Sequence, residues 1–514
     1  MAEQGASAQL DAIRSGYVVQ GASLDLGAAV DAGTAHPDVP VRIPLSAMNR
    51  HGLVAGATGT GKTKTLQVMA EQLSAHGVPV FLADIKGDLS GVASPGVAND
   101  RVSARAAEVG QQWAPAPCPT EFLSLGGRGA GVPVRATITS FGPTLLAKVL
   151  GLNEVQESSL GLVFHFADSQ GLLLLDLADL RAVVQHLTSD AGKDELKALG
   201  GLSSATAGVI LRELIAFADA GADVFFGEPE FDTADLLRRG EDGRGMVTCL
   251  ELPDVQAQPA LFSTFLMWLL ADLFHDLPEV GDLDQPKLVF FFDEAHLLFT
   301  GASKDFVASI EQTVRLIRSK GVGVFFVTQT PKDVPSGVLA QLGNRVQHAL
   351  RAYTPDDAKA LKATVSTFPT SAYDLEELLT QLGTGEAVVT VLSERGAPTP
   401  VAWTRLRAPQ SLMAPSSPDV VAAVTSSSPL APRYGEQVDR ESAYEKLGAR
   451  VVAAPPASPS EPERRPEPKS EHAPESMAEQ VVTSSVFRSM ARSAATVIGR
   501  EITRSLFGTA RRRR

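Results

Sequence analysis

A glycine-rich octapeptide near the start of the chain has the residue types needed to bind the phosphates of a nucleotide. Residues 56–63 read GATGTGKT and match G-x-x-x-x-G-K-[ST] at every fixed position. Glycines let backbone N–H groups converge on phosphate oxygens, because no Cβ is in the way. We expect Lys62 to reach the β- and γ-phosphates and Thr63 to bind Mg²⁺. The pattern therefore predicts a site for ATP and Mg²⁺.

The sequence around this motif favours a phosphate-binding loop over a glycine-rich turn that matches by accident. The apolar run 53–55 precedes it, and apolar residues at helical spacing follow it. A strand, a loop and a helix in this order also place the positive end of the helix at the phosphates. The expected nucleotide contacts are Gly56, Ala57, Thr58, Gly59, Thr60, Gly61, Lys62, Thr63 and Lys64.

A second motif supplies the carboxylates that ATP hydrolysis needs. The apolar run 288–292 ends in Asp293 and Glu294, as a central parallel strand with a Walker B motif would. We expect Asp293 to hold Mg²⁺ and Glu294 to polarise the water that attacks the γ-phosphate. A solvated loop is the alternative for an isolated Asp-Glu pair. We interpret the nearby His296 as a structural contact rather than a catalytic group.

A polar side chain at the end of the next buried strand could sense the γ-phosphate. Residues 322–328 form an apolar run that ends beside Gln329. From a strand next to the Walker B strand, its amide could contact both the γ-phosphate and the attacking water. The alternative is an amide that caps the strand end or the turn at Pro331.

Phosphoryl transfer also requires a positive charge near the γ-phosphate. Arg318, at the end of the helix after the Walker B motif, is our first candidate for an arginine finger, and Arg345 is the second. In a ring of subunits, such an arginine could reach the nucleotide of a neighbour. A surface or interface salt bridge is the alternative for each.

Composition restricts the class of protein. The 514 residues are 44% hydrophobic and 20% charged, which predicts a globular chain with a substantial core. The net charge of −13 argues against a surface coated for non-specific nucleic-acid binding, although a local basic channel is compatible with it. The two cysteines match no zinc or disulfide spacing. With no signal peptide or membrane span recognised, we expect a soluble, cytoplasmic protein.

Strands that alternate with helices predict an α/β fold with a parallel sheet. We expect most of the sequence from 89 to 130 to be loop, because glycine, alanine and proline dominate it. The patterns divide the chain into six segments. The first four are a lead-in (1–40), a first core part with the P-loop (41–135), a helical insertion (136–240) and a second core part (241–407). A disordered linker rich in proline, serine, alanine and glutamate (408–480), with one short helix over 433–450, and a basic tail (481–514) follow.

The tail has the pattern of a basic amphipathic helix. Residues 481–514 contain eight arginines against one glutamate, and four arginines share one helical face. Such a helix could lie on an anionic membrane surface, contact DNA phosphates or dock on a neighbouring subunit. It could also pack on its own core.

Several segments together resemble the HerA/FtsK group of ring ATPases, and more narrowly the bacterial HerA-like helicases of the YjgR type. They are 51–63, 84–88, 314–331 and the Walker B run, together with 134–156, 342–350 and 433–447 for the narrower family. The resemblance implies a RecA-like core, ATP hydrolysis and a homo-hexameric ring acting on double-stranded DNA. It also implies that Arg318 acts in trans. Archaeal HerA proteins carry an N-terminal β-barrel, and we expect none here, because only about 40 residues precede the P-loop region.

The leading hypothesis is therefore an ATP-driven DNA translocase or helicase. One alternative is an ATPase that remodels or anchors a protein assembly without a nucleic-acid substrate. Another is a nucleotide-dependent switch with slow turnover, which the combination of Glu294, Gln329 and Arg318 makes less favourable.

Overall fold

The computed structural model describes residues 2–256, 258–281, 283–300 and 302–453. One 12-stranded sheet runs through this part of the chain, in the order β2-β1-β12-β11-β10-β3-β9-β8-β4-β7-β5-β6. The strands are β1 (Ser23–Asp31), β2 (Thr34–Pro44), β3 (Gly52–Ala55), β4 (Val80–Asp84), β5 (Thr120–Leu125), β6 (Val132–Val134), β7 (Val247–Glu251), β8 (Leu288–Phe292), β9 (Val322–Thr328), β10 (Asn344–Gln347), β11 (Glu386–Thr390) and β12 (Ala402–Leu406).

The eight strands from β10 to β6 are parallel to their neighbours. The strands from β10 to β2 extend the sheet in antiparallel pairs. The predicted α/β fold with a parallel sheet is thus confirmed. The parallel strands are short apolar runs because helices cover both of their faces.

Alternate residues of each central strand supply two separate cores, since successive strand side chains point to opposite faces. In β8, Phe290 and Phe292 join the core formed with α9 (Pro259–Asp276) and α11 (Lys304–Ile317). Val289 and Phe291 join the other core, which includes α2 (Lys62–Ala75). The two cores thereby support, from both faces, the central strands whose carboxyl ends lie at the P-loop.

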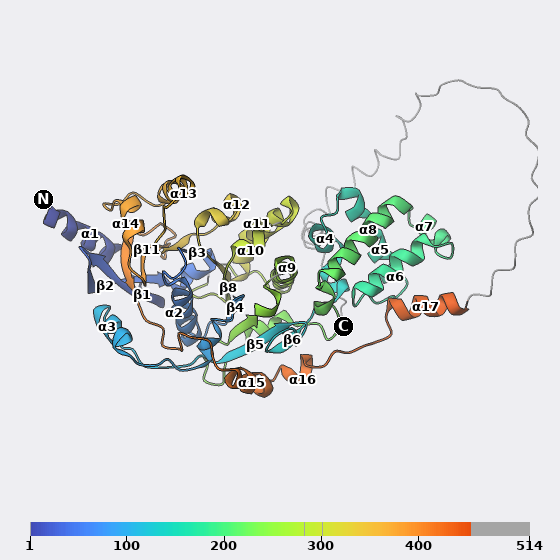
Figure 1. Ribbon diagram of the computed structural model, residues 1–514, viewed down its shortest axis with the longest axis horizontal. Helices are drawn as coiled ribbons and strands as arrows, with labels where there is room; N and C mark the ends of the chain where they lie inside the picture. The colour runs from blue at the N-terminus through green and yellow to red at the C-terminus, as the bar shows by residue number, and fades with distance from the viewer. Residues whose placement is uncertain (1, 257, 282, 301, 454–514) are drawn as a thin grey trace, which may run out of the picture.

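The insertion between β6 and β7 is helical over much of its length. Figure 1 shows its main helices grouped at the β6 end of the sheet, far from β2. They are α4 (Ile138–Val149), α5 (Glu154–Ser169), α6 (Leu177–Thr188), α7 (Lys193–Ala198) and α8 (Ser204–Asp219). Several of these helices have an N-terminal side-chain cap. At α5, Asn153 and Gln156 form a capping box, in which each side chain accepts the backbone N–H of the other residue.

The N-terminal region differs from a simple lead-in. It forms α1 (Ala2–Gly16) and the β1–β2 hairpin, and β1 pairs with β12. Strand β2 lies at the edge of the sheet, as its prolines require. The region from 89 to 130, expected to be mostly loop, contains α3 (Asp100–Glu108) and β5. Helix α3 begins at an Asn99 cap, a local signal that the abundant Gly and Pro around it obscured.

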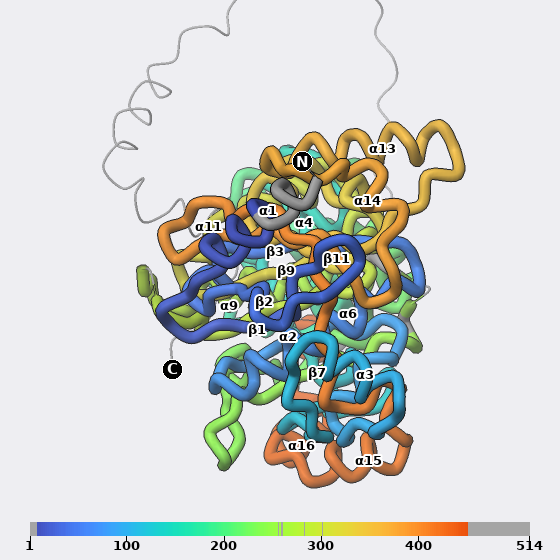
Figure 2. The backbone as a smooth tube through the Cα atoms, turned by 90° about the vertical axis from the view of Figure 1, so that its left-hand side faces the viewer, coloured from blue at the N-terminus to red at the C-terminus, as the bar shows by residue number. Residues whose placement is uncertain are grey.

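The first part of the segment expected to be a linker packs on the core instead. It contains α15 (Pro418–Ser427), α16 (Ala431–Tyr434) and α17 (Ala443–Ala453), so the single helix expected over 433–450 is divided in two. The backbone N–H groups of Gln410 and Ser411 donate to Glu71 on α2. Further along, Arg433 pairs with Asp232 and Asp235. Figure 2 shows α15 and α16 on the opposite side of the molecule from α13 (Pro355–Val365).

The rest of the predicted linker and the basic tail lie outside the described residues.

The remaining helices are α10 (His296–Phe299), α12 (Ser336–Leu339) and α14 (Leu375–Gln381). Within the described ranges, no helix combines the length and apolarity that crossing a membrane demands.

Candidate functional site

The candidate site lies at the carboxyl ends of β3, β9, β8 and β4, where ligands of open parallel sheets bind. The P-loop connects β3 to α2, and Gly56, Gly59 and Gly61 have φ angles of 159°, 80° and 113°. Backbone bonds attach it to three neighbouring segments. Gly56 N donates to Thr328 O at 3.2 Å, Ala57 N to Ala349 O at 2.8 Å, and Gly385 N to Thr60 O at 2.9 Å. The loop is therefore preorganised by the strands around it.

His348, which the sequence analysis did not single out, lies beneath this loop. Its side chain is fully buried, and its Nε2 is 2.9 Å from Thr65 Oγ1. Burial, assisted by the charge of Lys62, lowers the pKa of His348 to about 4, so the ring is neutral at physiological pH. A Cβ on Gly56 would lie 2.4 Å from the Cβ of His348. Close packing against the Cβ and backbone of His348 thus explains the glycine at position 56.

Gly56→Ala is expected to destabilise the protein, because the new methyl group must displace the backbone or His348. Gly33→Ala is the matched control, since Gly33 also has a positive φ of 81° but its Cβ would meet nothing within 4 Å. We expect Gly56→Ala to cost about 1–3 kcal/mol more than the control, as overpacking does. Denaturant unfolding of both variants measures the difference, and equal losses would contradict the packing argument.

Lys62 lies inside the P-loop. Its Nζ donates to the carbonyl oxygens of Gly56 at 2.7 Å and Ala57 at 3.2 Å. Burial lowers the pKa of Lys62, and the carboxylates of Glu294 and Asp293 act in the opposite direction. The ammonium group is thus held at the first turn of α2, and the backbone N–H groups at the start of a helix favour an anion.

The two carboxylates after β8 occupy different surroundings. Asp293 Oδ1 accepts the backbone N–H of Glu294 at 2.9 Å, whereas its buried Oδ2 has no hydrogen-bond partner in the described part of the chain. Burial and the neighbouring Glu294 raise the pKa of Asp293 to about 7. A buried, unsatisfied carboxylate oxygen suits a cation or its bound water. Asp293, with the half-buried Thr63, could therefore hold Mg²⁺.

Glu294 has a left-handed backbone, with φ of 46°. Its side chain is only 6% exposed and forms an ion pair with Lys86, which follows β4. Burial by itself raises the pKa of Glu294, but the hydrogen bond and charge of Lys86 outweigh it, so the pKa lies below its usual value. Glu294 is consequently ionised at neutral pH.

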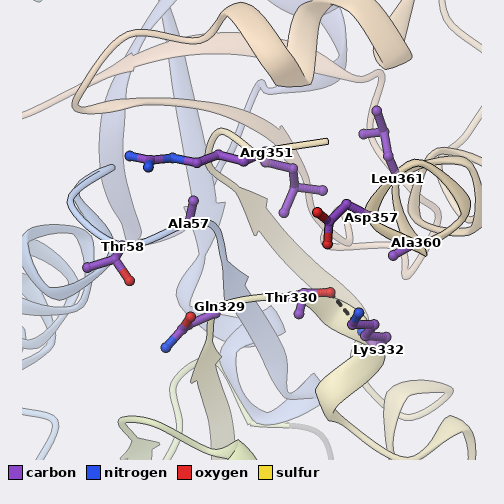
Figure 3. Close-up of a pocket in the computed structure, with 10 residues that line it drawn as sticks. Ala57, Thr58, Gln329, Thr330, Lys332, Arg351, Asp357, Ala360 and Leu361 are labelled. Carbon is purple, nitrogen blue, oxygen red and sulfur yellow. Dashed lines mark hydrogen bonds between the residues drawn. The ribbon is translucent and has the colours of Figure 1, made fainter. Parts of the chain in front are cut away.

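Gln329 follows β9 directly and faces a cavity of about 260 Å³ beside the P-loop. Thr58, Lys332, Arg351 and Asp357 also line this cavity. In Figure 3, Gln329 and Arg351 approach the P-loop residues from opposite sides. Sequence reasoning did not place Arg351 here, because only the pairing of β10 with β3 brings the end of β10 next to the loop.

The structure does not bring the two candidate arginine fingers to their own P-loop. Arg318 begins a 3₁₀ turn just before β9, at the opposite end of that strand from Gln329. The seven residues of β9 separate the two ends by roughly 20 Å, at 3.3 Å per residue. Arg345 lies within β10 and bonds to Thr367. Any action of Arg318 on a nucleotide would thus be on that of another subunit.

Two further acidic residues were missed: Asp84 ends β4, which lies beside β8, and Glu251 ends β7, which lies on the other side of β4. Asp84 is fully buried and accepts the N–H groups of Gly87 at 2.7 Å and Leu89 at 2.8 Å. Burial raises the pKa of Asp84 to about 6. Burial also raises the pKa of Glu251, to about 8, and the nearby charges of Asp84 and Asp88 act in the same direction. The acidic residues in 84–88 gave a sequence signal, but their place beside β8 depends on strand order.

Comparison with known proteins places this chain in a family. Residues 30–514 match the family described as "Helicase HerA-like C-terminal". The chain belongs to this HerA-like family. It is 24% identical over 356 residues to the "DNA double-strand break repair helicase HerA" of Sulfurisphaera tokodaii, and 22% identical over 360 residues to that of Saccharolobus solfataricus. Each match covers 68% of this chain and 64% of the relative.

Solved structures agree with the fold of this HerA-like protein. The bacterial conjugative coupling protein TrwB superposes with a TM-score of 0.52 at 16% identity, covering 80% of this chain and 94% of that chain. TrwB in complex with ADP and Mg²⁺ gives a TM-score of 0.51 at 17% identity, covering 78% and 97%. The predicted RecA-like P-loop core is therefore confirmed as the fold.

Proposed function

We propose that this HerA-like protein is a Mg²⁺-dependent ATPase that works as a motor on double-stranded DNA. One observation carries the ATPase: Lys62, the carboxylates of Asp293 and Glu294, and Gln329 come together at the ends of three adjacent strands. The P-loop thus supplies a cation, the end of β8 supplies a metal ligand and a base, and the end of β9 supplies an amide. Phosphoryl transfer needs this combination of groups.

Each residue then has a defined role. The backbone of residues 56–64 binds the nucleotide phosphates, and Lys62 neutralises the β- and γ-phosphates. Thr63 and Asp293 would hold Mg²⁺, which neutralises charge on the same oxygens when bound. Glu294 accepts a hydrogen bond from the attacking water, and Gln329 contacts that water and the γ-phosphate from the end of β9.

DNA is the proposed substrate because the HerA relatives are named as DNA double-strand break repair helicases. A ring, most simply a homo-hexamer, would place Arg318 of one subunit near the nucleotide of its neighbour, with Arg345 as the second candidate for the arginine finger.

The second candidate function is an ATPase that remodels or anchors a protein assembly. The net charge of −13 favours it, because an acidic surface repels DNA outside a local channel.

The test of the DNA motor is ATP hydrolysis with and without double-stranded DNA at two salt concentrations. We expect DNA to raise turnover, and the stimulation to fade at higher salt because phosphate contacts release counterions. Glu294→Gln should remove both the basal and the stimulated rates. Turnover that is indifferent to DNA would contradict the motor and support the protein-remodelling ATPase, whereas no turnover in any condition would contradict both.

A further inference from the structure

Lys86 contacts the carboxylate proposed to activate water. It follows β4, which pairs with β8 so that Ala83 lies beside Phe292. This register brings the residues after both strands together, and Lys86 Nζ donates a hydrogen bond to Glu294 Oε1. The two side chains differ in burial, since 42% of the Lys86 side chain is exposed against 6% of that of Glu294.

The second oxygen of Glu294 has no comparable anchor. Oε2 is buried and has no hydrogen-bond partner among the described residues. His296 Nδ1 lies 3.2 Å from it, a contact that is an ion pair only when the imidazole is protonated. Lys62 is the other cation whose charge acts on this carboxylate. One oxygen thus accepts a hydrogen bond from an ammonium group, while the other, buried beside His296, accepts none from the described residues.

Stability alone does not explain this ion pair. An ion pair whose ammonium group is partly exposed is screened by solvent and contributes little to stability. Moreover, Glu294 has a φ of 46°, and a left-handed backbone is unfavourable at a non-glycine residue. The ion pair with Lys86 therefore does not account for the strained backbone of Glu294. Such strain is typical of functional sites, where the direction of a side chain matters.

We propose that Lys86 is a positioning residue for Glu294, and this inference rests on the proposed ATPase function. The ammonium group holds Oε1 and so directs Oε2 at the attacking water. The oxygen of that water forms the new bond to the γ-phosphorus, and the bond to the β,γ-bridging oxygen breaks with its electron pair going to ADP. The proton of the water leaves through Oε2 and ends on the phosphate. In this proposal Lys86 acts through its contact with Glu294 and takes no direct part in the reaction.

A double-mutant cycle tests this inference in the full-length protein. We expect Lys86→Met to lower kcat about tenfold without raising KM, and Lys86→Arg to restore most of the loss. If Lys86 acts only through Glu294, Lys86→Met should have no further effect on single-turnover hydrolysis in a Glu294→Gln background. Arg244→Met is the matched control, because Arg244 forms an ion pair with Asp242 and its side chain is 37% exposed. It should leave kcat unchanged.

The outcomes separate the inference from the function on which it rests. A wild-type protein without ATP hydrolysis would contradict the proposed function itself. Active wild type combined with an unchanged or faster Lys86→Met variant would overturn only the positioning role. The same holds if Lys86→Met slows the Glu294→Gln variant further, since an independent structural defect would be additive. Thermal unfolding and binding of a non-hydrolysable ATP analogue show whether Lys86→Met is folded, and Lys86→Arg tests the role if it is not.

Discussion

Glu294→Gln is expected to reduce ATP hydrolysis about 10³-fold, within the range that a positioned general base contributes, while nucleotide binding is preserved. Glutamine keeps the size of the side chain but cannot accept a proton from water. The P-loop contacts of Lys62 do not involve Glu294, so the phosphate site should remain intact. Steady-state hydrolysis and binding of a fluorescent ATP analogue measure the two properties separately.

Lys62→Ala provides the contrast to this variant. It removes the ammonium group from the loop and should therefore weaken binding of the analogue as well as hydrolysis. If Glu294→Gln lost nucleotide binding to the same degree as Lys62→Ala, Glu294 would be a structural support of the loop and not the base. If Glu294→Gln retained hydrolysis, another group would have to activate the water.

Arg318→Ala is expected to reduce hydrolysis by about 10³-fold or more, the range for an arginine that stabilises charge on the transferred phosphoryl group. Because Arg318 lies at the far end of β9 from Gln329, the loss should occur at the nucleotide of a neighbouring subunit. Arg315→Ala is the control on the preceding helix. Its exposed guanidinium pairs with Glu311 at 2.6 Å, and its removal should leave turnover unchanged.

Mixing two inactive variants tests whether Arg318 acts between subunits. In a mixed ring, a subunit with Arg318→Ala still has Glu294, and a Glu294→Gln neighbour still has Arg318. Some interfaces would then contain both intact groups, so we expect partial recovery of hydrolysis. If the mixture stays inactive although the subunits exchange, Arg318 does not act in trans, and Arg345→Ala should be mixed in the same way.

The motifs that carry the proposed chemistry could be found in the sequence because each depends on a few adjacent residues. The P-loop pattern needs its glycines and Lys62 at fixed spacing, since a single turn and the start of one helix form it. The runs 288–292 and 322–328 were recognisable as buried strands because helices cover both faces of a parallel sheet. Gln329 was found as a candidate because it follows such a run directly.

Regions of low hydrophobicity were less predictable because local composition does not show what packs against them. Residues 408–453 have the composition of a linker, yet Glu71 and Asp232 provide partners for Ser411 and Arg433. Likewise, the β1–β2 hairpin is stabilised by pairing with β12, which lies more than 300 residues later. Only long-range contacts decide whether such segments fold onto a core.

The sequence by itself determined the phosphate-binding loop, the two carboxylates after β8 and the α/β class, because these follow from residue type and short-range periodicity. The tertiary structure alone decided which strand ends meet. The order β10-β3-β9-β8-β4 puts His348 beneath the P-loop, Arg351 beside it and Lys86 against Glu294. Strand order results from pairing between segments far apart in the chain, and no pattern within one segment encodes its neighbours.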